Sequence, residues 1–76
     1  MSNPNPLSLK DEEILCLAKE GWAYKQIAVM THPPCSERTV KRHVREILMK
    51  LGARNRTHAV VIAIRNGYLS LQDTGV

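Results

Sequence analysis

The residues with the most distinctive chemistry in this sequence are four cations at helical spacing between positions 36 and 51. They recur at i, i+3, i+4 and i+7, on one arc of a helix that turns by about 100° per residue: Arg38, Lys41, Arg42 and Arg45. Guanidinium and ammonium groups neutralise phosphates and donate hydrogen bonds to guanine O6 and N7. The pattern indicates a surface that binds a polyanion. The alternative is a solvated basic face, because Lys and Arg are good helix formers.

The same helix carries a second arc that requires a protein core. Five apolar residues recur at i, i+4, i+7, i+8 and i+11, well over a right angle from the cations: Val40, Val44, Ile47, Leu48 and Leu51. Only two acids, Glu37 and Glu46, fall within the helix, and neither shares the centre of the cationic arc. The helix is therefore expected to pack on one side and to present positive charge on the other.

The charge of the whole chain points to an oriented anionic partner. The 76 residues make one small domain with a net charge of +4, and its core is expected to be aliphatic because the chain has no Phe. From residue 36 to 66 there are eight Lys or Arg and two acids, whereas the rest of the chain has three Lys or Arg and five acids. The positive charge therefore belongs to the C-terminal half.

Other function classes find little support. Cys16 and Cys35 lie far apart without a CxxC pattern or a preceding signal sequence, so a reduced, cytoplasmic protein is expected, with Cys16 in the core. His32 and Cys35 lack the further ligands of a zinc site, so we expect no metal and no cofactor. The longest apolar run, residues 59–64, is too short to cross a bilayer, for which about 20 residues are needed. No nucleophile, base and orienting group come together, so we expect no catalytic residue and no enzyme.

Local start and stop signals predict four helices and no strand. Ser8 and Asp11 form a capping-box pattern at the start of the first helix. The buried stripe of that helix is expected to be Ile14, Leu15, Leu17 and Ala18. A second, short helix over 24–30 lacks a capping side chain, because Ala23 offers no acceptor, and it must end before Pro33.

The last two helices carry the charged and the apolar surfaces. Ser36 caps the basic helix, and Asn55 caps a fourth helix from Arg56 to about Asn66 that is apolar nearly all round. Its inward flank is expected to be Ala59, Val60 and Ala63. Val61 and Ile62 are then left for a partner, and the alternative is a helix buried in the centre of the core.

A short helix, a turn and a long basic helix form the layout of a helix-turn-helix, whose second helix fits the major groove of DNA. The sequence also resembles the DNA-binding domains of the LuxR/GerE/FixJ (NarL) type. The resemblance rests on T-V-K-x-H at 39–43, K-L-G at 50–52, R-x-x-A-V at 56–60 and G-x-L at 67–69, with E-I-L at 13–15 and K-Q-I-A at 25–28. It covers residues 7 to 69, and the joint spacing is specific.

The resemblance implies an all-α fold, a compact four-helix domain that contains a helix-turn-helix and whose last helix is a dimerisation helix. It implies a sequence-specific transcriptional regulator that binds an inverted repeat in double-stranded DNA as a homodimer, with helix 36–51 in the major groove. It further implies a place in the cytoplasm with the nucleoid, contact with RNA polymerase or other regulators, and no contact with a membrane. The expected boundaries are a disordered lead or linker remnant at 1–6, the domain at 7–70 and a C-terminal tail at 71–76.

Site residues follow from the resemblance position by position. The residues expected to contact base edges are Lys41, Arg42, Arg45 and Val40, the last through a thymine methyl group. The residues expected to contact the DNA backbone are Lys25, Tyr24, Arg38, Thr39 and His43. The residues expected at the dimer interface are His58, Val61, Ile62 and Arg65. For His43 the alternative is a half-buried, hydrogen-bonded residue that bridges the two helices.

Three departures from the family pattern bear on these expectations. Ten residues, 29–38, separate the alanine of the second helix from the T-V pair, where the family has eight, and Pro33 and Pro34 are among them. The angle at which the basic helix meets DNA is therefore left open. Tyr24 stands where the family prefers Asn, and Glu46 also replaces an Asn. Only six residues precede the domain, so either an excised effector domain or a stand-alone regulator is expected.

A second function class stays open. A truncated relative could act as an interaction module or anti-activator that pairs with full-length LuxR-type regulators through helix 56–66 and has little affinity for DNA. The intact stripe of Lys41, Arg42 and Arg45 argues against this reading, because a decoy needs no groove-facing cations. A polymerase-associated module akin to sigma-factor region 4 has the same helix-turn-helix but lacks the T-V-K-x-H and K-L-G motifs.

Overall fold

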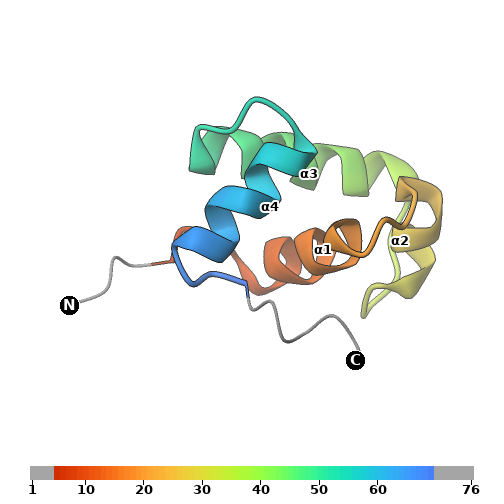
Figure 1. Cartoon of the computed structure of the whole chain (residues 1–76). Coiled ribbons are helices and arrows are strands. Elements are labelled where there is room, and N and C mark those ends of the chain that lie inside the picture. Colours follow the sequence, from red (N-terminus) through yellow and green to blue (C-terminus); the bar gives the residue numbers. More distant parts are fainter. Residues whose placement is uncertain (1–4, 70–76) are drawn as a thin grey trace.

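The computed structural model describes residues 5–69, which fold into four helices (Figure 1). These are α1 (Leu9–Lys19), α2 (Tyr24–Met30), α3 (Glu37–Leu51) and α4 (Arg56–Arg65), and the described part of the chain contains no strand. The predicted all-α class is confirmed, as are the predicted positions of the helices. Most of the expected lead and all of the expected tail lie outside the described residues. Between residues 5 and 69, no helix is long and apolar enough to cross a lipid bilayer.

Each helix begins where its local chemistry predicts. Ser8 Oγ accepts from the Asp11 amide at 3.1 Å, and Asp11 Oδ2 accepts from the Ser8 amide at 3.1 Å, which closes the capping box of α1. The side chains of Ser36 and Asn55 accept from backbone amides in the first turns of α3 and α4. Ala23 supplies no side-chain acceptor to α2, as predicted.

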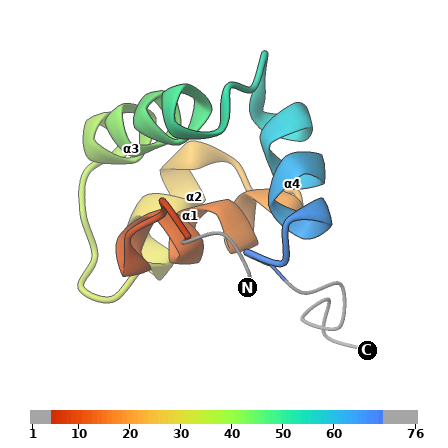
Figure 2. The same ribbon diagram turned by 90° about the vertical axis from the view of Figure 1, so that its left-hand side faces the viewer.

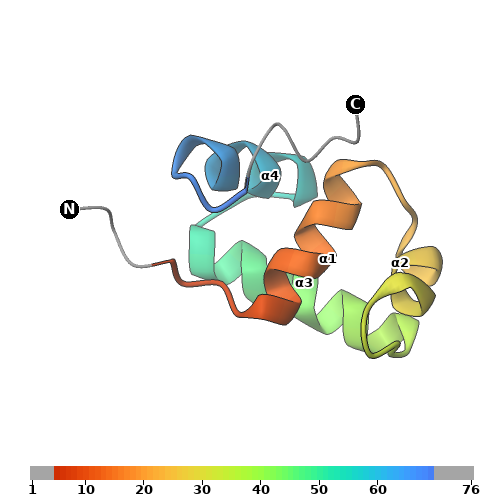
Figure 3. The same cartoon turned by 90° about the horizontal axis from the view of Figure 1, so that it is seen from below.

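The long basic helix α3 lies along one side of the molecule, with the other helices beneath and beside it (Figure 2). The view from below shows α1 crossing α3, and α1 contacts all three of the other helices (Figure 3). The N-terminal half of α3 packs against α2, and its C-terminal half packs against α4. One face of α3 is thus held by the rest of the domain, and the opposite face is left outside.

The core consists of two aliphatic clusters that meet along α3. The first joins α1, α3 and α4 and contains Leu7, Leu15, Ile47, Ala59, Ala63 and Leu69. The second joins α1, α2 and α3 and contains Ile14, Ala18, Ile27, Ala28, Val40 and Val44. Leu48 packs against both clusters. Cys16 and Leu17, which were expected in the core, are only half-buried and pack at its edges.

The long turn between α2 and α3 is packed onto α1. The Pro33 carbonyl accepts from Lys10 Nζ at 3.0 Å, and the His32 amide donates to Glu13 Oε2 at 2.9 Å. Lys10 and Glu13 also form an ion pair at 3.3 Å. Thr31 at the start of the turn is fully buried, with its hydroxyl 3.2 Å from the Pro33 carbonyl. The lengthened turn is therefore accommodated by bonds to α1.

The core assignment predicts a large difference between two neighbouring residues of α3. Ile47 is completely buried in the first cluster, so Ile47→Ala leaves a cavity and should lower the free energy of unfolding by about 2–5 kcal/mol. Met49 is 77% exposed, so Met49→Ala should change it by less than about 0.5 kcal/mol. Urea unfolding followed by circular dichroism measures both. Similar losses in the two variants would contradict this orientation of α3.

Candidate nucleic-acid interface

The four cations of α3 lie together on its exposed side. All four are exposed, and they line one surface pocket together with Thr39. The four cations are Arg38, Lys41, Arg42 and Arg45. Lys41 Nζ is 3.5 Å from Glu37 Oε2 in an exposed ion pair, which contributes little to stability. The three arginines have no ion-pair partner among residues 5–69. The face is therefore positive and open to an anionic ligand.

Val40 does not belong to this face. Its exposed fraction is 0%, and it lies in the cluster between α1, α2 and α3. The residue falls on the apolar arc of α3, so the packing that holds α3 in place also covers Val40. The expectation that Val40 contacts a thymine methyl group is wrong for this fold, because a base could reach the side chain only if the core opened.

Three further candidates for backbone contacts lie in the first turns of α2 and α3. Lys25 is exposed in the first turn of α2. Tyr24 is half-buried beneath the guanidinium of Arg56, which lies 5.1 Å from the centroid of the ring. Thr39 Oγ1 is 3.0 Å from Ser36 Oγ at the start of α3. The stacking of Arg56 on Tyr24, which the sequence patterns did not indicate, ties the start of α4 to the start of α2.

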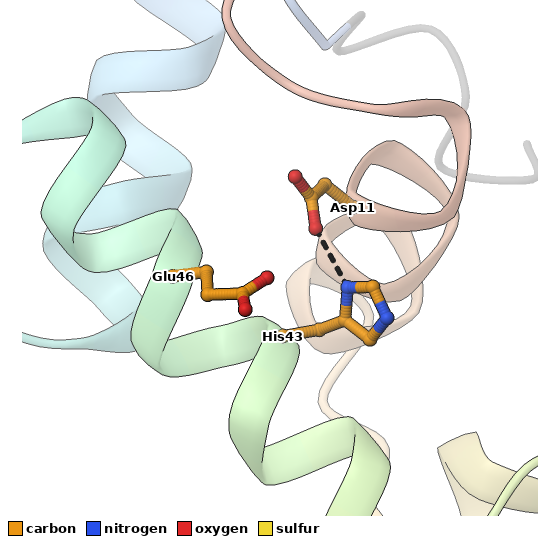
Figure 4. Close-up of side chains that lie close together, drawn as sticks. All are labelled: Asp11, His43 and Glu46. Atoms are coloured by element: carbon orange, nitrogen blue, oxygen red, sulfur yellow. Dashed lines mark hydrogen bonds and ion pairs between the residues drawn. The ribbon is translucent and has the colours of Figure 1, made fainter.

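Asp11 has a role that the capping pattern alone did not indicate. Its carboxylate is completely buried and joins α1 to the flank of α3. Oδ1 lies 2.8 Å from His43 Nδ1, as Figure 4 shows, and Oδ2 lies 2.6 Å from Lys50 Nζ. His43 and Lys50 are seven residues apart and so share one flank of the helix, separated by about 20°. That shared flank is the signal in the sequence that could have revealed the contact.

The pKa of Asp11 is lower than its ordinary value in spite of its burial. Burial by itself raises the pKa, because it disfavours the charged form. The hydrogen bonds from Lys50, from His43 and from the backbone of Ser8 stabilise the carboxylate, and together they outweigh burial. Asp11 therefore carries a negative charge at neutral pH and anchors the flank of α3 as an ion.

Glu46 lies close to this anchor. An oxygen of Glu46, an oxygen of Asp11 and a ring nitrogen of His43 all lie within 4.8 Å of one another (Figure 4). These atom types bind divalent metals in other proteins. The ammonium group of Lys50, however, already neutralises Asp11 at 2.6 Å, and a metal cation would have to displace it. We therefore describe the group as an ion-pair cluster and assign no metal to it.

The four residues expected on the outward side of α4 differ in how exposed they are. Val61 is 41% exposed and Arg65 is exposed, whereas His58 and Ile62 are half-buried. His58 Nδ1 accepts from the Arg54 amide at 3.1 Å, so its ring closes the loop before α4. Among the four candidates for a dimer interface, Val61 thus offers the most accessible apolar surface.

Comparison with known proteins agrees with this arrangement. The family described as bacterial regulatory proteins, luxR family, has a model that matches residues 5–63. The chain belongs to the luxR family. It is a helix-turn-helix domain homologous to transcriptional regulators, and the luxR family is not a family of enzymes.

Several luxR-type relatives are much longer than this chain. The chain is 39% identical over 69 residues to the uncharacterized transcriptional regulatory protein YvfU of Bacillus subtilis (strain 168), a match over 91% of this chain and 34% of that protein. It is 36% identical over 66 residues to the transcriptional regulatory protein DegU of Brevibacillus brevis, over 87% of this chain and 27% of that protein. The chain thus spans about a third or less of these regulators.

A solved structure of the transcription factor GerE matches nearly the whole domain. The TM-score is 0.81 and the sequence identity 31%, over 90% of this chain and 98% of that chain. The four-helix arrangement described above is therefore a GerE-like fold. The longer α2–α3 turn of this chain is compatible with that fold.

The buried carboxylate predicts how stability depends on pH. The pKa of Asp11 in the folded state lies below the ordinary value of an aspartate side chain, so its charge stabilises the fold above about pH 4. That stabilisation is lost as the pH falls through the lowered pKa. Asp11→Asn should cost about 1–3 kcal/mol at neutral pH and flatten the decline of the unfolding free energy below pH 5. Urea unfolding from about pH 3 to pH 7 measures both effects. An equally steep decline in the variant would contradict this role.

Proposed function

We propose that this luxR-type domain is a sequence-specific DNA-binding domain of a transcriptional regulator, with α3 in the major groove. The observation that carries the proposal is the open cationic face of α3, whose arginines have no ion-pair partner among the described residues. A helix of this diameter fits the major groove, and the helix-turn-helix holds such a helix with its charged side outward. The names of YvfU and DegU as transcriptional regulatory proteins support the regulatory role.

The candidates divide into two proposed roles by the family positions that they match. Lys41, Arg42 and Arg45 are the candidates for base edges, and all three line the cationic face of α3. The candidates for phosphate contacts are Arg38 and Thr39 on the same face, His43 on the flank of α3, and Tyr24 and Lys25 in the first turn of α2. Phosphate contacts fix the register of the domain on the duplex, and base contacts select the sequence.

Two copies of the domain are proposed to bind an inverted repeat. The interface would be the outward side of α4, with Val61 at its most accessible point and His58, Ile62 and Arg65 around it. A twofold pair of α3 helices in successive major grooves has centres about 34 Å apart, one turn of DNA. A regulator of this kind acts at the nucleoid, where RNA polymerase or other regulators are its further partners.

The deciding experiment selects binders from a randomised duplex pool and measures their affinity by fluorescence anisotropy at two salt concentrations. The proposal expects enrichment of an inverted repeat that binds about 10³-fold or more tightly than random DNA. Weak, strongly salt-dependent binding without enrichment would mean that the charge of α3 is only electrostatic. The domain would then be an interaction module that pairs with full-length regulators through α4.

Replacing a residue that contacts bases should weaken binding more on some DNA sequences than on others. Replacing a residue that contacts a phosphate should weaken binding to every DNA sequence equally. Arg42→Ala or Arg45→Ala should cost about 1–3 kcal/mol on the selected site and relax the preference at one base position. Lys25→Ala should instead weaken binding to every sequence and lower the slope of log K against log salt by about one. The measurement is anisotropy on the selected site and its single-base variants. A loss that is equal on all duplexes would make the arginines phosphate contacts.

The α4 interface should fail when charge is placed at its apolar centre. Val61→Glu buries a carboxylate if α4 pairs with a second copy, so it should weaken dimerisation by about 2 kcal/mol or more. Val29→Glu is the matched control, because Val29 is 70% exposed on α2, away from the proposed interface. Sedimentation velocity of both variants on the selected duplex measures the stoichiometry. An undiminished dimer of Val61→Glu would place the interface elsewhere.

A further inference from the structure

Among the candidate phosphate contacts, His43 is the residue whose side chain is hydrogen-bonded to the buried carboxylate of Asp11. Its Nδ1 lies 2.8 Å from Asp11 Oδ1, and its side chain is 18% exposed. An ionised carboxylate can only accept hydrogen bonds, so the proton of this bond must sit on Nδ1. Asp11 therefore selects the tautomer of the ring and fixes its orientation.

The second ring nitrogen is left for an external partner. Figure 4 shows Nε2 on the side of the ring that faces away from Asp11. No hydrogen bond from a described residue reaches Nε2, and no buried side-chain nitrogen or oxygen of the described residues lacks a partner. Nε2 is therefore accessible from outside the domain. Residues four apart on a helix are neighbours, so His43 lies beside Thr39, which lines the cationic face. An anion bound at that edge of the face would come within reach of Nε2.

The charge state of the ring decides whether such an anion can bind. A neutral ring with its proton on Nδ1 presents a lone pair at Nε2, which repels a phosphate oxygen. The imidazolium form donates from both nitrogens at once, to Asp11 and to the phosphate. The charged groups around the ring are Asp11 on α1 and Glu46 and Lys50 on α3. Among the described residues, no charged group of α2 or α4 forms a hydrogen bond or an ion pair with the His43 ring.

We propose that His43 binds a DNA phosphate as the imidazolium, with Asp11 as the positioning residue that holds its ring, so that DNA binding takes up a proton. The inference rests on the proposed function and adds a chemical condition to it. Affinity for DNA of any sequence then falls as the pH rises, because the phosphate contact carries no base information.

The test compares affinities at about pH 6 and about pH 8, on either side of the ordinary pKa of histidine. The probe is a labelled duplex of random sequence at low salt, where phosphate contacts dominate, and the readout is anisotropy. The wild-type domain should bind about tenfold more weakly at the higher pH. If it binds the duplex at neither pH, the proposed function fails. If it binds equally at both, only the inference fails.

Three variants locate the effect. His43→Asn keeps an amide N–H at the place of Nδ1 for Asp11 but has no donor at the place of Nε2, so it should bind more weakly at pH 6 and show no dependence on pH. Asp11→Asn should move the dependence to lower pH, because the imidazolium loses its counter-charge. His32→Gln, in the exposed α2–α3 turn, is the control and should keep the wild-type dependence. Thermal unfolding by circular dichroism checks that each variant is folded at both pH values.

The variants also define the results that would overturn the inference. A His43→Asn variant that keeps the wild-type dependence on pH would show that another group takes up the proton. A His32→Gln variant that loses the dependence would assign the proton to the turn. An Asp11→Asn variant that is folded and binds with an unshifted profile would remove Asp11 as the positioning residue.

Discussion

The orientation of α3 within this domain depends on the hydrogen bonds to the buried carboxylate of Asp11. A carboxylate without water must be neutralised and hydrogen-bonded, because an unpaired buried charge is strongly destabilising. Here the donors come from two places, the start of α1 and the flank of α3 that carries His43 and Lys50. Apolar packing alone allows a helix to roll by small angles, since aliphatic contacts have little directionality. The apolar arc turns the cations outward, and the bonds from His43 and Lys50 to Asp11 restrict the remaining roll of α3.

The same geometry explains how a small domain keeps several unpaired cations on one helix. The apolar arc of α3 connects both core clusters, so this helix takes part in all of the core packing that those clusters describe. Repulsion among exposed arginines costs only a few tenths of a kcal/mol for each pair and is weakened by salt. Packing on one arc therefore outweighs repulsion on the other. An anion placed on this face would weaken the repulsion further.

Features that depend on nearby residues were predictable from the sequence, and those that depend on distant ones were not. The caps at Ser8, Ser36 and Asn55 follow from hydrogen bonds within one helical turn. The contacts of Asp11 span 32 and 39 residues. The sequence shows only that His43 and Lys50 share one flank of α3, and the folded chain reveals which residue they contact. Val40 was misassigned because a role was carried over by position, although its place on the apolar arc already predicted burial.

The α2–α3 turn is bonded to the helices on both sides of it. The open question from the sequence was whether two extra residues change the angle between the two helices. Lys10 and Glu13 hold the turn against α1, and the Cys35 amide returns to the Ala28 carbonyl at 2.9 Å. The α2 and α3 residues of the second cluster still pack against each other. The longer turn is therefore bonded to α1, and α2 and α3 pack together in the same cluster.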